Sequence, residues 1–388
     1  MVVPPAPSFI YDIVTFILQY LIVVNNVLSQ IVPPPPFPFG PLLDAIQDFL
    51  NIISRLYVPV HVIIRNHYDG NCWLIPHGQS IWNTLVASPE NFWFVTGETP
   101  GSLTRVIERI GIEVEARVRD PWNPRRRLQV TRPYVLCLHD RILLTFMWLR
   151  QYYTITSLSE LFHISPSNVY DTILTIVPIF YEHYAHRYVN WNSDNNWNDQ
   201  RGEFDELPNA VGAIDAFAVQ INRPQGAMQR LYYRRDRGYH FLNFHVIVDN
   251  DGFFQFSSGG YPGHGTDAAS YARLPSIGYQ RQLHLPRSAY LLADRGYPSV
   301  YPLVTPFSRP RRGRLNNIQV RANLEIDRAR VRVEQRIGDA RVYRSIPGRS
   351  GRFRGRRHFV PVVVGAVLSI VNRRRRLIRR LRIQFLAL

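Results

Sequence analysis

Two aspartates stand beside apolar segments whose pattern predicts β-strands. Asp215 lies in the middle of residues 210–221, and Asp294 directly follows the short apolar segment 289–293. Residues 295–298 (Arg-Gly-Tyr-Pro) are a turn signal, which predicts that Asp294 lies at the edge of the sheet. A carboxylate next to a core is costly unless it is exposed, paired or neutralised by a cation. Each aspartate therefore needs exposure at the sheet edge, a paired group or a cation.

Glu334 is the third acid in an unexpected place. It belongs to residues 321–343, whose apolar spacing predicts a helix. Leu324, Val331 and Gly338 fall on its face at three- and four-residue steps. We therefore expect Glu334 to point toward the sheet and not into solvent.

Three carboxylates on separate elements suit a hard divalent cation. Mg²⁺ and Mn²⁺ prefer oxygen ligands and keep coordination positions open for water and phosphate. Two such ions about 4 Å apart can activate the attacking oxygen and stabilise the leaving oxygen of a phosphodiester. The residues alone leave a second interpretation open, in which Asp215 and Glu334 form buried ion pairs with the many arginines.

The elements that must position these acids occur in the order strands, then helix. Residues 241–248 and 253–257 are strand-like and flank the hairpin turn at 249–252, and the helix at 321–343 comes later. Strands followed by a helix that returns over them predict an α/β or α+β layer.

A helical region precedes the strands and contains a helix-turn-helix pattern. Residues 157–163 and 168–180 are helical, and Ser165 and Pro166 between them suit a helix start. Ser165, Ser167 and Asn168 are the candidate DNA contacts at the start of the second helix. An ordinary helical hairpin stays open as an alternative, because the second helix carries almost no positive charge.

The net charge of +17 favours a polyanion as partner. All 46 basic residues are arginine, whose planar fork suits phosphate, so nucleic acid is favoured over an anionic membrane. Compositional bias explains arginine in place of lysine but not the excess charge. Two clusters neighbour the acids in sequence, Arg234, Arg235 and Arg237 before a strand, and Arg311 and Arg312 before the late helix. Solvated loop charge is the alternative interpretation of both clusters.

Two apolar segments resemble membrane signals, but both are too short. Residues 13–24 and 359–371 fall below the roughly 20 apolar residues that span a bilayer, so we expect no membrane partner. Cys72 and Cys137 are far apart and form no CxxC, which argues against a cysteine zinc site and a disulfide framework.

Several segments resemble the successive sequence blocks of PIF/Harbinger transposases and the domesticated nucleases derived from them. The most specific are ADRGYP at 293–298 and RARVRVE at 328–334. GAIDAFAVQINRP (212–224), YYRRDRGYHFLNFHVIVDNDGFF (232–254) and GGYPGHGTDAASYARL (259–274) occur in the family's order. The resemblance covers residues 211–346, about a third of the chain.

The resemblance implies a ribonuclease H-like α/β fold, a mixed sheet with flanking helices, preceded by the helix-turn-helix. It implies that two Mg²⁺ or Mn²⁺ ions are bound by four carboxylates, Asp215, Asp267, Asp294 and Glu334. Of these, the catalytic residues are Asp215, Asp294 and Glu334. Asp267 rests on the resemblance alone, since from the residues it is equally the N-cap of a helix starting at Ala268. The implied function is a DNA endonuclease or strand transferase that works with a Myb/SANT-like accessory protein. The Arg-rich tail after residue 350 suggests nuclear import, and homo-oligomerisation stays open.

The sequence departs from the family pattern at two places, and the first of them, together with the long apolar segment 13–24, supports an alternative function. Residues 215–218 are Asp-Ala-Phe-Ala where the family has Asp-Gly-Thr-His, and residues 335–338 are Gln-Arg-Ile-Gly where it has Arg-Ala-Phe-Gly. A catalytically inactive, domesticated DNA-binding or adaptor protein with the same fold therefore remains the alternative.

The chain divides into six parts on these patterns. They are an apolar helix with a Pro-rich spacer (1–40), an unassigned region (41–125), the helical region (126–188), a polar linker (189–210), the nuclease domain (211–346) and an Arg-rich tail with an apolar helix (347–388).

Overall fold

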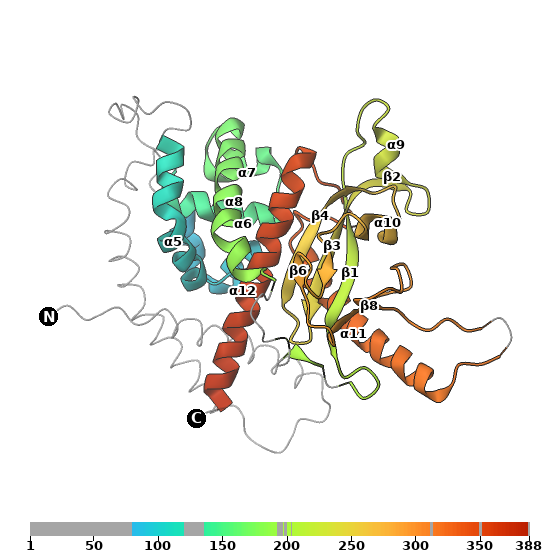
Figure 1. Cartoon of the computed structure of the whole chain (residues 1–388). Helices are drawn as coiled ribbons and strands as arrows, with labels where there is room; N and C mark the ends of the chain where they lie inside the picture. Colours follow the sequence, from blue (N-terminus) through green and yellow to red (C-terminus); the bar gives the residue numbers. More distant parts are fainter. Residues whose placement is uncertain are drawn as a thin grey trace, which may run out of the picture. The chain divides into compact units, whose positions relative to one another are not determined.

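The computed structural model describes residues 80–119, 136–191, 197, 200–202, 204–310, 313–348 and 351–386 (Figure 1). The chain divides into two compact units. The first unit runs to Trp148 and includes residues 153–176, and the second comprises residues 149–152 and the chain from Val177 onward.

The described part of the first unit is helical. Its helices are α3 (Ile81–Val86), α4 (Pro89–Thr96), α5 (Pro100–Arg119), most of α6 (Leu138–Gln151), α7 (Ile155–Phe162) and the first half of α8 (Pro166–Tyr188). Leu103, Ile107 and Ile110 of α5 are fully buried at the spacing of one helix face. This unit therefore has an apolar core of its own.

Helices α7 and α8 form the predicted helix-turn-helix. Helix α7 ends at His163, which adopts the left-handed conformation that closes a helix. The Ser165 hydroxyl accepts the Asn168 N–H at 3.2 Å, so the predicted cap of α8 is confirmed. Val169 and Ile173 of α8 are buried, as their spacing predicts.

A mixed β-sheet forms the centre of the second unit. Its antiparallel half contains β1 (Ala210–Gln220), β3 (Tyr239–Asp249) and β4 (Phe254–Pro262), and its parallel half adds β7 (Tyr290–Leu292) and β8 (Leu303–Val304) beside β1. The resulting order is β4-β3-β1-β7-β8, with the short β2 (Tyr233–Arg234) paired to the start of β3. Strands β5 (Ile277–Gly278) and β6 (Leu283–His284) form a separate parallel pair. Because β1 lies between β3 and β7, residues on β1 and at the end of β7 are neighbours.

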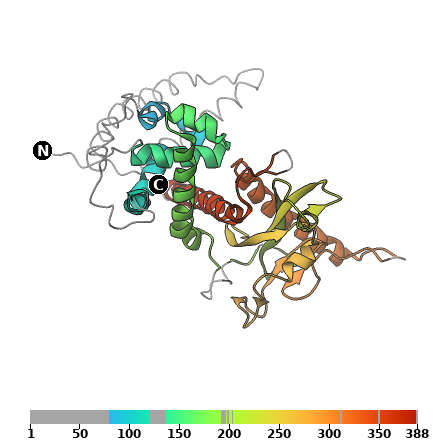
Figure 2. The ribbon, with the colours of Figure 1, turned by 90° about the horizontal axis from the view of Figure 1, so that it is seen from above.

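Helices surround this sheet, in agreement with the predicted ribonuclease H-like α/β fold. They are α9 (Gln229–Tyr232), α10 (Asp267–Tyr271), α11 (Asn317–Arg341) and α12 (Val360–Leu386), the last preceded by the 3₁₀ turn η4 (Arg357–Phe359). Helix α11 packs on β1 and α12 packs on β4 (Figure 2).

The predicted buried face of α11 is wrong by about two residues. Leu324 and Val331 are 54% and 49% exposed, whereas Ala322, Ile326 and Val333 are buried. Apart from Glu325, the buried stripe of α11 is made of small or β-branched residues, so the larger leucine was a misleading marker of the core face. Glu334 directly follows the buried Val333 and lies at the flank of the stripe, not under it.

Two tryptophans of the segment predicted as a polar linker pack against the second unit. Trp191 and Trp197 are buried against each other and against the β-sheet core. Each tryptophan side chain buries a large apolar area, and the free energy gained by this burial stabilises both residues against the core.

The predicted Arg-rich tail is also part of the fold. Phe353 is fully buried, and its N–H donates to the Gln220 carbonyl at the end of β1. The apolar helix predicted in this tail corresponds to the start of α12, where Val363 and Val367 are buried.

Several predictions fall outside the described residues. They concern the apolar helix and Pro-rich spacer at 1–40, the unassigned residues up to 79, Cys72, and the arginines Arg311 and Arg312. Among the helices that the structure describes, none is long and apolar enough to cross a membrane.

Candidate functional site

Asp215 occupies the middle of β1, as predicted, and pairs across the ladder with Val246 of β3. Its Oδ1 accepts the N–H of Ala216 at 2.7 Å. Burial is the main reason why the pKa of Asp215 rises to about 6. The negative charges of Asp294 and Glu334 act in the same direction on this pKa, and Arg330 acts against it. Asp215 is therefore in electrostatic contact with both other predicted acids.

Asp294 lies two residues beyond β7, beside β1, where the parallel pairing of these strands brings it close to Asp215. The Gly296 N–H donates to its Oδ1 and fixes the turn. A Cβ at Gly296 would lie 2.9 Å from Asp294 Oδ1 and 3.5 Å from Asp267 Oδ2. Glycine at this position therefore lets two carboxylates approach the same backbone atom.

Glu334 reaches the acidic site from α11, although its side chain is 53% exposed. Arg330, one helical turn earlier, connects it to the other acids. The Arg330 Nη2 lies 3.1 Å from Glu334 Oε1 and 4.0 Å from Asp294 Oδ2. We call Asp215, Asp267, Asp294 and Glu334 the acidic site and keep this name below.

Asp267 is the first residue of α10 and not its N-cap. The cap is Thr266, whose hydroxyl accepts the Ala269 N–H at 3.2 Å, so the predicted capping role of Asp267 is wrong. Its carboxylate is instead bound by the Asn243 side chain, whose Nδ2 donates to Asp267 Oδ1 at 3.1 Å. With the capping role gone, the Asp267 side chain is available to the acidic site.

A buried network of hydrogen bonds holds the Asp267 carboxylate in position. The sequence analysis did not predict this network. The hydroxyl of Tyr297 lies 2.7 Å from His245 Nδ1, and His245 Nε2 lies 2.9 Å from Ser270 Oγ. Asn243 also donates to Ser270, at 3.3 Å, which joins the network to the Asp267 carboxylate. Burial lowers the pKa of His245 to about 4, so its imidazole is neutral near pH 7.

One proton arrangement satisfies this network. Tyr297 donates to Nδ1 of His245, Nε2–H donates to Ser270, and the Ser270 hydroxyl donates to the Thr266 carbonyl at 3.0 Å. A signal was present in the sequence, since Asn243 and His245 interrupt an otherwise apolar strand at positions that share one face.

Comparison with known proteins agrees with this architecture. Residues 214–372 match the family described as DDE superfamily endonuclease, and residues 134–185 match the helix-turn-helix of DDE superfamily endonuclease. The chain carries a domain of the DDE superfamily endonuclease type. No curated protein and no solved structure matches the chain.

The DDE domain extends beyond the predicted boundary at residue 346. Its match ends at Asn372, within α12. Asn372 is fully buried, its Oδ1 accepts the Phe254 N–H at 3.0 Å, and its Nδ2 donates to the Phe254 carbonyl at 2.8 Å. The side chain thus pairs with the backbone of β4 much as a neighbouring strand would.

The donors of the acidic site fit a divalent metal by their chemistry. All four are carboxylates, the oxygen ligands that Mg²⁺ and Mn²⁺ prefer. Among the residues that the structure describes, no three His, Cys, Asp or Glu side chains come together as a group that could hold an ion. The guanidinium of Arg330 lies between the acids instead.

The predicted DNA contacts of the second unit differ in their surroundings. Arg234 is engaged inside the domain by Asp236 at 2.8 Å and by the ring of Phe241. Arg237 also lies over Phe241, whereas Arg235 is exposed. In the first unit, Ser165, Ser167 and Asn168 are exposed at the start of α8, with 3.0 Å between the Ser165 and Ser167 hydroxyls.

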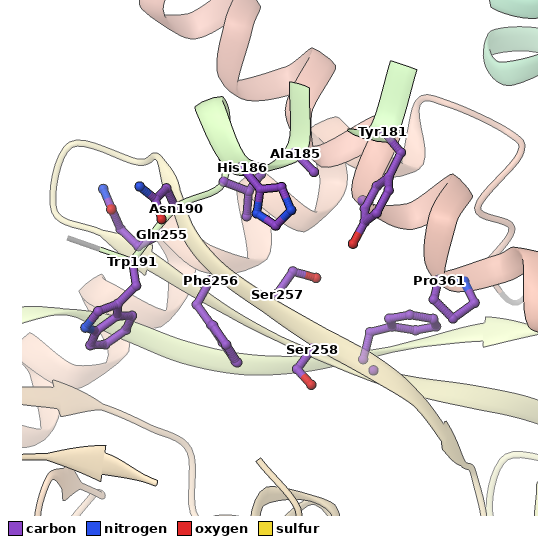
Figure 3. Close-up of a pocket in the computed structure, with 14 residues that line it drawn as sticks. Tyr181, Ala185, His186, Asn190, Trp191, Gln255, Phe256, Ser257, Ser258 and Pro361 are labelled. Atoms are coloured by element: carbon purple, nitrogen blue, oxygen red, sulfur yellow. The ribbon is translucent and has the colours of Figure 1, made fainter. Parts of the chain in front are cut away.

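A cavity of about 460 Å³ lies elsewhere in the second unit, between the end of α8, β4 and the start of α12 (Figure 3). Tyr181 and His186 face it from α8, Ser257 and Phe256 from β4, and Pro361 from α12. No member of the acidic site lines it. The cavity and the acidic site are therefore separate features of the second unit.

Proposed function

We propose that this chain is a divalent-metal-dependent DNA endonuclease or strand transferase of the PIF/Harbinger type. The observation that carries the proposal is electrostatic. The charges of Asp294 at the end of β7 and Glu334 on α11 both act on Asp215 in β1, and Arg330 lies between Asp294 and Glu334. The three acids are far apart in sequence and lie within the stretch that matches the DDE superfamily endonuclease. The motifs ADRGYP and RARVRVE support the Harbinger assignment.

In this proposal Asp215, Asp294 and Glu334 are the catalytic acids, and Asp267 joins them as a metal ligand. A pair of Mg²⁺ or Mn²⁺ ions, when bound, supplies activation of the attacking oxygen and stabilisation of the leaving oxygen of a DNA phosphodiester. Asp215 must give up its proton to act as a ligand, and its raised pKa therefore makes metal binding weaker as the pH falls.

The chain's other residues orient the acids and the DNA. Asn243 holds one oxygen of Asp267, so the second oxygen keeps a fixed direction. Gly296 leaves the space between Asp267 and Asp294 open. The start of α8 would contact base edges, and exposed arginines such as Arg235 would contact the phosphate backbone.

The test is cleavage of DNA that carries candidate terminal inverted repeats, in Mg²⁺ or Mn²⁺. We expect Asp215→Asn to lower the cleavage rate by at least about a hundredfold, because a ligand oxygen becomes a neutral amide. Asp251→Asn is the matched control, since Asp251 is an exposed turn residue paired with Arg379. Equal cleavage rates for the wild type and Asp215→Asn would contradict the proposal.

A catalytically inactive DNA-binding or adaptor protein is the second candidate. Two observations favour it, the half-exposed Glu334 in its ion pair with Arg330 and the apolar Ala-Phe-Ala that follows Asp215. Calorimetry with Mn²⁺ separates the two candidates. Tight binding that is lost in Glu334→Ala contradicts the inactive protein, and no binding in either form contradicts the nuclease.

Partners and location complete the proposal. A Myb/SANT-like accessory protein would supply much of the DNA recognition, consistent with the low positive charge of α8. The arginine-rich α12 supports nuclear import and, with it, a nuclear location. A homo-oligomer would bring two acidic sites to the two ends of one DNA element.

A further inference from the structure

Arg330 has three acidic neighbours, of which Asp327 and Glu334 are on α11 and Asp294 follows β7. Its Nη2 lies 3.1 Å from Glu334 Oε1 and 4.0 Å from Asp294 Oδ2, and its Nη1 lies 3.8 Å from Asp327 Oδ1. Its charge also lowers the pKa of Asp215. One guanidinium thus offsets the mutual repulsion of Asp215, Asp294 and Glu334.

The guanidinium is near the acids but not locked among them. Its Nε is buried without a hydrogen-bond partner, and its one close charged contact is to the half-exposed Glu334. Ion pairs of solvent-exposed side chains are weak, because water screens the charges and both side chains lose conformational freedom. The side chain can therefore leave Glu334 at little cost.

We propose that Arg330 is an internal counter-ion that competes with the divalent metal for Asp294 and Glu334 and so limits how tightly the metal binds. The inference rests on the proposed function, because it assumes that the acidic site binds metal. It adds a residue that regulates metal loading and contributes no ligand atom.

The competition follows from charge and from shared partners. A divalent ion held by Asp294 and Glu334 needs the oxygens that Arg330 now faces. A single positive charge a few ångströms from a divalent ion also repels it strongly in a partly buried site. Metal binding therefore requires the guanidinium to move away from both carboxylates.

Asp327 offers Arg330 a second position. It lies on the opposite side of Arg330 from Glu334 along α11, and its side chain is 63% exposed. Spacings of three and four residues place both acids within reach of the same arginine. Rotation of one side chain, without movement of the helix, transfers Arg330 from Glu334 to Asp327.

The experiment measures Mn²⁺ affinity by calorimetry at low ionic strength, with far-UV circular dichroism to verify folding. The variants are Arg330→Gln and the matched control Arg332→Gln. Arg332 is on the same helix and carries the same charge, but its Nη1 donates to the Asn250 carbonyl and not to the acidic site. We expect Arg330→Gln to bind Mn²⁺ about tenfold more tightly than wild type. Arg332→Gln should stay within about twofold of wild type, as should Arg330→Lys, which keeps the charge.

The results separate this inference from the function on which it rests. If Asp215→Asn weakens Mn²⁺ binding but Arg330→Gln binds no more tightly than Arg332→Gln, the competition is refuted and the metal site stands. Weaker binding by Arg330→Gln also refutes it, because Arg330 would then position Glu334. If Asp215→Asn leaves Mn²⁺ binding unchanged, the acidic site is not the metal site and both proposals fail.

Discussion

At the scale of single residues, the unusual property of this molecule is the environment of Asp215. An aspartate in the middle of an apolar strand loses much of its hydration, and the acids of the neighbouring elements add negative charge around it. The same features that make the carboxylate costly in the protein without metal make it a strong ligand for a cation. Asp215 is therefore a position where stability and function oppose each other.

This opposition predicts the effect of pH on the metal-free protein. The pKa of Asp215 is about 6 in the folded protein and near 3.8 in the unfolded chain. Because the folded value is raised, the stabilising contribution of the protonated group is complete below pH 3.8 and is lost as pH rises through 6. We expect Asp215→Asn to match wild type near pH 4 and to be more stable by about 2 kcal/mol at pH 8.

The measurement is denaturant unfolding in the presence of a chelator at several pH values. Asp251→Asn, at an exposed turn, is the control variant. A destabilised Asp215→Asn at pH 8 would show that Asp215 makes favourable contacts that outweigh its desolvation.

At the scale of elements, close backbone approaches explain positions that side-chain patterns do not reveal. Gly212 at the start of β1 faces β3 so closely that an added Cβ would lie 2.4 Å from the Val248 carbonyl oxygen. Gly338 in α11 has no atom within 4 Å of such a Cβ. Two glycines of one domain thus have opposite structural roles.

Alanine substitutions test this difference. Gly338→Ala should stabilise the protein by up to about 1 kcal/mol, because alanine is the better helix former and meets no obstacle. Gly212→Ala should destabilise it by about 2 kcal/mol or more, because β1 and β3 must separate. The midpoint of denaturant unfolding measures both effects, and a shift of both variants in the same direction contradicts the geometry.

Most helices and strands could be predicted from the sequence, but the face of α11 that packs against the sheet could not. Strands around Asp215, at 241–248 and before Asp294 were predicted close to their positions in β1, β3 and β7. The two-residue strand β8 was missed, because so short a segment has no period. The face of α11 was wrong because small residues such as Ala322 pack against the sheet while Leu324 is exposed.

At the same scale, the acidic site was only partly accessible from the sequence. Asp215 and Asp294 could be found because a charge interrupts or ends an apolar strand. Asn243 and His245 also interrupt a strand, but only the fold shows that they meet Tyr297 and α10. Contacts between residues more than twenty positions apart depend on the sheet order, which local patterns do not encode.

At the scale of the whole molecule, the second unit extends well past the last strand of its sheet. The motifs end near residue 346, but Val363, Val367 and Ile370 of α12 are fully buried. Asn372 then pairs with both backbone groups of Phe254 on β4. The helix thus covers a strand that would otherwise lie at the open edge of the sheet, a site prone to aggregation.

Truncation of the full chain distinguishes the boundary predicted from motifs from the one given by packing. A chain of residues 1–346 lacks all of α12, and we expect it to aggregate, because the loss of each buried valine or isoleucine removes about 1.5–3 kcal/mol. A chain of residues 1–379 keeps every buried residue of α12 described up to Val371 and should remain folded and monodisperse. Size-exclusion chromatography and near-UV circular dichroism distinguish the two results. A soluble, cooperatively folding 1–346 chain would show that the β-sheet and α11 suffice, and that α12 is an addition to the domain and not part of its core.

Asn372→Ala in the full chain isolates the pairing with β4. We expect it to lower the free energy of unfolding by about 1–3 kcal/mol, because two backbone groups of Phe254 lose their hydrogen-bond partner.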